Sequence, residues 1–190
     1  LARTKPRASL TDDEESLQDI AHFVVPTAMA VLVGQYVLRW GIDSSDEWAY
    51  TFQAHTFAKL ESFSKAAPCG HAFQNYWVFD WEGRRFSQYT PGWPLFMVPF
   101  VWAGSITLAA PFSLGALGVV TGRLARRLVD GPARAWAASM AVLALTLSTT
   151  VLINGGSRFP HIWVTACFGW TFEALFRCSE VTTRRARIAS

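Results

Sequence analysis

Residues 86–122, FSQYTPGWPLFMVPFVWAGSITLAAPFSLGALGVVTG, carry no charged side chain and decide how often the chain crosses a membrane. One helix of that length would be about 55 Å long, too long for a single span of a hydrocarbon core about 30 Å thick. Two spans with a turn would be short, and Pro91, Pro94, Pro99 and Pro111 interrupt the run. The run therefore predicts one span joined to a second, shorter apolar segment.

Arginine clusters beyond this run support the single span. One cluster lies at 123–134, another at 177–187, and a shorter basic stretch lies near the N-terminus. Cytoplasmic loops carry an excess of Lys and Arg, so all three are expected on the cytoplasmic side. This is consistent only if 86–122 crosses once. We predict a helix lying at the outer surface over 91–104 and a span over 108–124, because aromatic residues favour the interface.

Three further apolar runs complete the predicted fold class, an all-α polytopic membrane protein with about four transmembrane helices. The N-terminus is expected in the cytoplasm and the protein in the cytoplasmic (inner) membrane. The chain is taken as the N-terminal fragment of a longer protein. The predicted parts are the spans 20–40, 108–124, 135–154 and 159–176, the cytoplasmic segments 1–19 and 178–190, and the outer loop 41–107.

The composition agrees with this class. The chain is 51% hydrophobic and only 16% charged, whereas soluble domains are nearer a quarter charged. The net charge is +3, and the basic residues fall into clusters separated by long apolar runs. A nucleic-acid-binding protein would gather such residues on one solvated face, so no nucleic-acid partner is expected.

The outer loop carries an acidic pair, Asp46-Glu47, directly after the first span. Ionisable groups close to a bilayer mark functional sites more often than those of a soluble core. Aromatic residues recur at helical spacing over 45–64, which predicts an amphipathic helix on the membrane surface. The alternative for the acidic pair is structural, since acids also cap the N-terminus of a helix.

Three motifs occur in order around the predicted spans. They are Asp46-Glu47-Trp48-Ala49-Tyr50, Ser87-Gln88-Tyr89-Thr90-Pro91-Gly92-Trp93-Pro94-Leu95, and Ser157…His161. Their order and spacing resemble polytopic glycosyltransferases of the GT-C class, in the protein-mannosyltransferase and aminoarabinose-transferase branch. The resemblance covers roughly residues 20–177. Two positions depart from the family pattern: Thr90 stands where proline is common, and Pro160 precedes His161 where a small polar residue is more usual.

The resemblance implies a sugar transfer from a polyprenyl-phosphate donor to a glycan, lipid or protein acceptor on the outer face of the membrane. It implies Asp46 as the base or acceptor-orienting residue, with Glu47 as the second candidate. The residues expected to bind substrate are Tyr50, Arg84, Arg85, Tyr89 and His161. Arginine suits the phosphate because its planar guanidinium binds two oxygens at once. Solvated loop charges and an interfacial histidine are the alternatives.

Other activities and groups stay open as alternatives. A transporter or flippase for lipid-linked sugars would place charges and broken helices at mid-membrane, and a non-catalytic scaffold would use the aromatic loop to bind a partner. His55 and His71 with Asp46 raise the question of a divalent metal, although no ligand spacing supports one, so no cofactor is assigned. Within the spans, Glu173 and Arg177 are predicted to pair at i,i+4, and Gly115, Gly118 and Gly122 to allow close helix packing.

Overall fold

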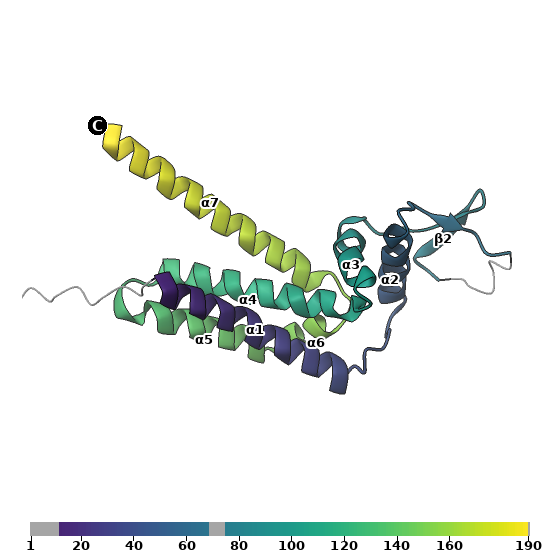
Figure 1. Ribbon diagram of the computed structural model, residues 1–190, viewed down its shortest axis with the longest axis horizontal. Helices are drawn as coiled ribbons and strands as arrows, with labels where there is room; N and C mark the ends of the chain where they lie inside the picture. The colour runs from purple at the N-terminus through teal and green to yellow at the C-terminus, as the bar shows by residue number, and fades with distance from the viewer. Residues whose placement is uncertain (1–11, 69–74, 190) are drawn as a thin grey trace, which may run out of the picture.

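The computed structural model describes residues 12–68 and 75–189, with side chains over 13–68 and 75–180. Most of this part of the chain is helical (Figure 1). The helices are α1 Asp12–Tyr36, α2 Ser45–Ala58, α3 Gly92–Trp102, α4 Ala109–Leu128, α5 Arg134–Leu147, α6 Thr149–Gly156 and α7 His161–Ala189, with short 3₁₀ turns at Ile106–Leu108 and Gly131–Ala133. Cys69, His71 and most of the predicted segment 1–19 lie outside the described residues.

Two helical segments among the described residues are long and apolar enough to cross a membrane, 13–36 in α1 and 106–128 around α4. α5 and α6 meet at a bend of 69°. They make a third candidate only if the pair is counted as one broken span. All but the first two residues of the predicted span 159–176 lie in α7, which does not meet the same test. The membrane class is therefore supported by two or three candidate spans, and the four-span topology stays a prediction.

The bundle is held together where α1 lies against the glycines of α4. A Cβ added to Gly118 would lie 2.2 Å from the His22 carbonyl oxygen, and one added to Gly122 would lie 2.3 Å from His22 Nδ1. The predicted close packing at these glycines is confirmed. Next to this contact, buried side chains from three helices form an apolar core that includes Ala30, Leu114 and Ile162.

α2 and α3 lie across one end of the bundle, the end at which α1 finishes and α7 begins (Figure 1). We call it the loop end, and the opposite end, where α4 finishes and α5 begins, the charged end. The two helices share a second core in which Tyr50 and Ala54 meet Trp93 and Met97. Both helices predicted for the outer loop are present. α2 begins where predicted because Ser44 caps it, accepting a hydrogen bond from the Glu47 N–H at 3.1 Å.

A small antiparallel sheet corrects the all-α prediction. Its strands are β1 Ser64–Lys65, β2 Val78–Trp81 and β3 Arg84–Ser87, in the order β1-β3-β2. β2 and β3 form a hairpin in register from Val78↔Ser87 to Trp81↔Arg84. Its two-residue turn, Glu82-Gly83, has positive φ at both positions, as the common hairpin turn requires. Glutamate is rare at such a position, which is why the hairpin escaped prediction.

Candidate functional site

Two residues from separate motifs meet at the loop end. Asp46 lies in the first turn of α2, and Tyr89 lies between β3 and α3. The Asp46 carboxylate lies close enough to the Tyr89 hydroxyl to raise the pKa of Tyr89. The Tyr89 ring also packs against the Tyr50 ring, with centroids 4.4 Å apart, and lies near the Trp77 ring at 5.9 Å. Three of the residues predicted for the site, Asp46, Tyr50 and Tyr89, are therefore brought together.

The electrostatics of this group keep both tyrosines protonated. Burial and the hydrogen bond with the Asp46 carboxylate raise the pKa of Tyr89 to about 12. Burial, together with the negative charge of Asp46, also raises the pKa of Tyr50. At neutral pH the Tyr89 hydroxyl is thus a hydrogen-bond donor to an acceptor carboxylate. Asp46 is held in one orientation by a group that does not itself lose its proton.

Glu47 is placed differently from its neighbour. Its side chain is buried, with 1% of the residue exposed, and points toward the turn between α6 and α7. One carboxylate oxygen accepts the backbone N–H of Asp43 at 2.9 Å, and the other accepts the backbone N–H of Arg158 at 2.8 Å. Both oxygens are therefore occupied by main-chain donors. Glu47 fastens α2 to the bundle, so of the two acids Asp46 is the better candidate for chemistry.

Arg158 is a residue of the loop end that sequence reasoning missed. Its Nη2 donates to the Trp40 carbonyl at 3.0 Å, and its own carbonyl accepts from Trp93 Nε1 at 2.9 Å. Burial lowers the pKa of Arg158, opposed by the negative charges of Glu47 and Asp43. No carboxylate of the described side chains lies within ion-pair distance of it. The available signal was an arginine between two apolar runs on the predicted outer side, against the positive-inside tendency.

The two arginines predicted to bind phosphate point to opposite faces of the hairpin. Arg85 is 8% exposed and makes two hydrogen bonds of 2.7 Å to the carboxylate of Asp80. These bonds raise the pKa of Arg85 and occupy one edge of its guanidinium. Arg84 points the other way, as neighbours in a strand do, and lies 4.5 Å from the centre of the Phe63 ring. Arg84 is the more accessible of the pair.

Neither His55 nor His161 lies beside the acidic pair, and His71 is outside the described residues. His161 is exposed at the first position of α7, where its ring stacks on Phe159 at 5.5 Å. His55 is exposed in the last turn of α2, at the other end of that helix from Asp46. Within 12–68 and 75–189, no group of three or more His, Cys, Asp or Glu side chains is placed to hold a metal ion.

A cavity of about 770 Å³ lies beside Tyr89. It is walled by the second half of α2, the turn that follows it, the β2–β3 hairpin and the start of α3. Most of its lining is aromatic or aliphatic. The lining residues are Gln53, Phe57, Leu60, Glu61, Ser62, Phe63, Trp81, Arg84, Phe86, Ser87, Tyr89, Pro91 and Leu95.

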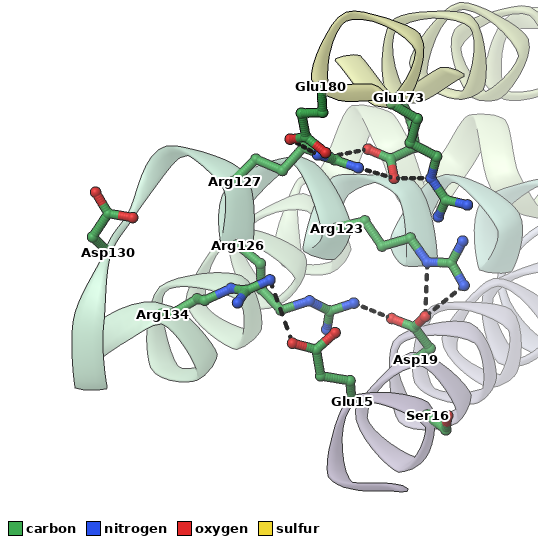
Figure 2. A pocket seen from close by; sticks show the side chains of 11 residues that line it. Glu15, Ser16, Asp19, Arg123, Arg126, Arg127, Asp130, Arg134, Glu173 and Glu180 are labelled. Atoms are coloured by element: carbon green, nitrogen blue, oxygen red, sulfur yellow. Dashed lines mark hydrogen bonds and ion pairs between the residues drawn. The ribbon is translucent and has the colours of Figure 1, made fainter. Parts of the chain in front are cut away.

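A second cavity, of about 590 Å³, occupies the charged end (Figure 2). Five arginines and five acidic residues line it, so their charges balance. Asp19 of α1 pairs with both Arg123 and Arg126 of α4, and Glu173 of α7 pairs with Arg127. The predicted ion pair between Glu173 and Arg177 is confirmed at 2.8 Å. With the pair of Arg134 and Glu15, this network joins α1, α4, α5 and α7, and its arginines are taken up by structural pairs.

Comparisons with known proteins return no match: no family model, curated protein or solved structure is similar to this chain. The candidate site therefore depends on the contacts of its own residues. The site has three features: the meeting of Asp46 with Tyr89, the half-buried Arg158, and the cavity that Tyr89 lines.

Proposed function

We propose that this chain is a membrane glycosyltransferase of the GT-C type, which moves a sugar from a polyprenyl-phosphate donor to an acceptor at the outer face. The observation that supports it best is the meeting of Asp46 with Tyr89, whose ring packs on that of Tyr50. These residues come from two of the motifs that carry the resemblance, and they meet at the loop end. A carboxylate within reach of the acceptor hydroxyl is what activation of that hydroxyl requires.

The proposed reaction is a displacement at the anomeric carbon of the donor sugar. The Asp46 carboxylate takes the proton of the acceptor hydroxyl, and the acceptor oxygen forms the new bond to the anomeric carbon. The bond from that carbon to the phosphate oxygen breaks, and the polyprenyl phosphate leaves with the electron pair. Tyr89 acts as a positioning residue, because its hydroxyl lies beside the Asp46 carboxylate that takes the proton.

The leaving phosphate needs a positive charge nearby. Arg85 is a poor choice since Asp80 already neutralises it. We assign this role to Arg158, which lies half-buried in the turn to which Glu47 fastens α2. Burial disfavours the charged form of an arginine. A half-buried arginine is therefore stabilised more by an incoming anion than a solvated arginine is.

The proposed topology has four spans: α1, α4, the broken pair α5–α6, and the first part of α7. The loop end then faces outward and both termini are cytoplasmic. The arginines concentrated at the charged end support this orientation, because cytoplasmic ends of spans carry the excess of Lys and Arg. The cytoplasmic (inner) membrane is the proposed location.

A transporter or flippase of lipid-linked sugars is the second candidate, and the break between α5 and α6 favours it. α5 has 14 residues and would be about 21 Å long, so the break falls within a hydrocarbon core about 30 Å thick. Broken helices at that depth are typical of transport sites. The charged groups of the described chain nevertheless lie at the two ends, which is the stronger argument for the enzyme.

The decisive experiment measures sugar transfer in membranes that contain the protein, with a panel of radiolabelled polyprenyl-phosphate sugars. Asp46→Asn is expected to lower turnover at least about 100-fold, as loss of a general base does. Glu82→Gln, at an exposed acid of the same loop that does not line the cavity, is the matched control and should retain full turnover. Turnover unchanged by Asp46→Asn would remove Asp46 from the mechanism.

The same membranes separate the enzyme from its rivals. Movement of the labelled lipid across sealed vesicles, without sugar transfer and without dependence on Asp46, would favour the transporter. Neither transfer nor movement, from protein shown to be folded, would favour a scaffold that binds a partner through its aromatic loop.

A further inference from the structure

The cavity beside Tyr89 lies along the same face of α2 as the proposed catalytic carboxylate. Asp46, Tyr50, Gln53 and Phe57 follow one another at intervals of four, three and four residues, so they share one face of α2. Asp46 and Tyr50 belong to the site, whereas Gln53 and Phe57 line the cavity. At 1.5 Å per residue, Gln53 lies about 10 Å along the helix from Asp46. The cavity therefore lies at a distance from Asp46 at which it can receive a part of a ligand remote from the reacting group.

The wall of the cavity offers aromatic surface with few open polar positions. Trp81 is 67% exposed and Phe63 is 41% exposed. Gln53 is already used, because its amide oxygen accepts the Ser87 N–H at 2.8 Å and its amide nitrogen donates to a backbone carbonyl. Arg84 lies on the Phe63 ring and has no ion pair within the described side chains. Cavities of this size, mostly apolar with a few polar groups, are typical of small-ligand sites.

The position of the cavity decides between an apolar chain and a polar ligand. The hairpin that forms its outer wall is the part of the described chain farthest from the helix bundle (Figure 1). The hydrocarbon tail of a lipid would have to leave the bilayer to reach it, and would gain in exchange only a partly apolar wall. A sugar has apolar C–H faces and hydroxyl edges, which suit aromatic rings flanked by Arg84 and Glu61.

We infer that this cavity binds the acceptor of the proposed transferase, and that the acceptor is a saccharide. That the ligand is the acceptor rests on the proposed function. That the ligand is a saccharide rests on the lining and position of the cavity. Binding of a remote sugar unit would hold the next hydroxyl near Asp46, which is how binding energy away from the reaction contributes to catalysis.

The test is direct binding to the purified protein in nanodiscs, without turnover. The probes are fluorescently labelled short neutral oligosaccharides of mannose, glucose and arabinose, with farnesyl phosphate as an unlabelled competitor. At least one oligosaccharide is expected to bind, and Trp81→Ala to weaken its affinity about tenfold or more. The matched control is Phe79→Ala, an exposed aromatic residue of the same strand that does not line the cavity. Thermal unfolding of each variant confirms that it is folded.

The outcomes separate this inference from the proposed function. Absence of binding by every oligosaccharide, or displacement of the sugar by farnesyl phosphate from the same cavity, would overturn the saccharide assignment even if Asp46-dependent transfer is present. Binding that Trp81→Ala and Phe79→Ala weaken equally would also overturn it. Binding that depends on Trp81, without any sugar transfer, would leave a saccharide-binding cavity and overturn its role in a transferase.

Discussion

The carboxylate of Glu47 accepts the backbone N–H of Arg158 at 2.8 Å, and these residues are 111 positions apart in the sequence. The bond joins the first turn of α2 to the turn between α6 and α7. Asp46 directly precedes Glu47 in the sequence, so the position of the proposed base depends on this contact. The two acids of one motif therefore have different tasks: one holds the helix in place, and the other faces Tyr89.

Glu47→Gln is expected to destabilise the protein. The amide has one accepting oxygen in place of two, so either Asp43 or Arg158 loses the acceptor of its N–H and faces an NH₂ group. A buried donor left without a partner costs about 1–3 kcal/mol of unfolding free energy. The measurement is denaturant unfolding in detergent micelles, with the exposed Glu61→Gln as control. Full stability with abolished sugar transfer would instead make Glu47 a catalytic residue.

Asp19→Asn should be more damaging. Asp19 is shared by Arg123 and Arg126, and the side chain of Arg126 is only 3% exposed. Removing the negative charge leaves a buried guanidinium without its counter-ion, which costs about 3–5 kcal/mol. Asp130→Asn is the control at the same end, because Asp130 is exposed and lies apart from the paired side chains (Figure 2). Equal stability of the two variants would contradict the role given to the network.

Two glycine substitutions should differ in their effect. In Gly118→Ala the new Cβ meets the backbone carbonyl of His22 at 2.2 Å, so α1 and α4 must move apart. Overpacking of this kind costs about 1–3 kcal/mol. In Gly155→Ala the nearest obstacle, at 2.7 Å, is a terminal methyl group of Leu114, which can rotate. A larger loss of thermal stability for Gly155→Ala than for Gly118→Ala would contradict this.

Tyr89 should make stability depend on pH in the alkaline range. Its pKa rises from 10.0 to about 12 in the folded protein. A raised pKa means that the protonated form stabilises the fold fully below about pH 10, and that this contribution is lost as pH rises towards about 12. The excess stability of the parent over Tyr89→Phe is therefore expected to shrink across that interval. A difference in stability between the parent and Tyr89→Phe that stays constant across that interval would contradict this prediction.

Cysteine labelling tests the proposed orientation. Cys178 is exposed on α7, beyond Glu173 and towards the charged end. A membrane-impermeant maleimide is expected to leave Cys178 unmodified in intact cells and to modify it after lysis, as read by mass spectrometry. Cys69, in the predicted outer loop, should react before lysis. Modification of Cys178 in intact cells would place the charged end outside and reverse the topology.

Helices could be predicted from the sequence where one signal decided them. The prolines and the lack of charge in 86–122 predicted both α3 and the long helix that follows, and both are present. The break between α5 and α6 had no such signal, because no proline or glycine stands at Ser148. Ser, Thr and β-branched residues around it weaken a helix only slightly, so the bend is decided by packing against other helices.

The site was predictable as a set of residues but not as an arrangement. The motifs pointed to Asp46, Tyr50 and Tyr89, and these do meet. The division of labour between Asp46 and Glu47 depends on which face of α2 meets the bundle. The same holds for Arg85, whose partner Asp80 is set by a hairpin register. Long-range contacts of this kind are properties of the folded chain and leave no local pattern.

The glycine contact between α1 and α4 also bears on the order of events during synthesis. Both helices, and the carboxylate and arginines that join them at the charged end, precede residue 130. The pair of α1 and α4 can assemble as soon as α4 leaves the ribosome, before α5 is synthesised. α6 and α7 would then pack against this preformed pair. The contact between Glu47 and Arg158, which holds Asp46 in place, would be the last to form.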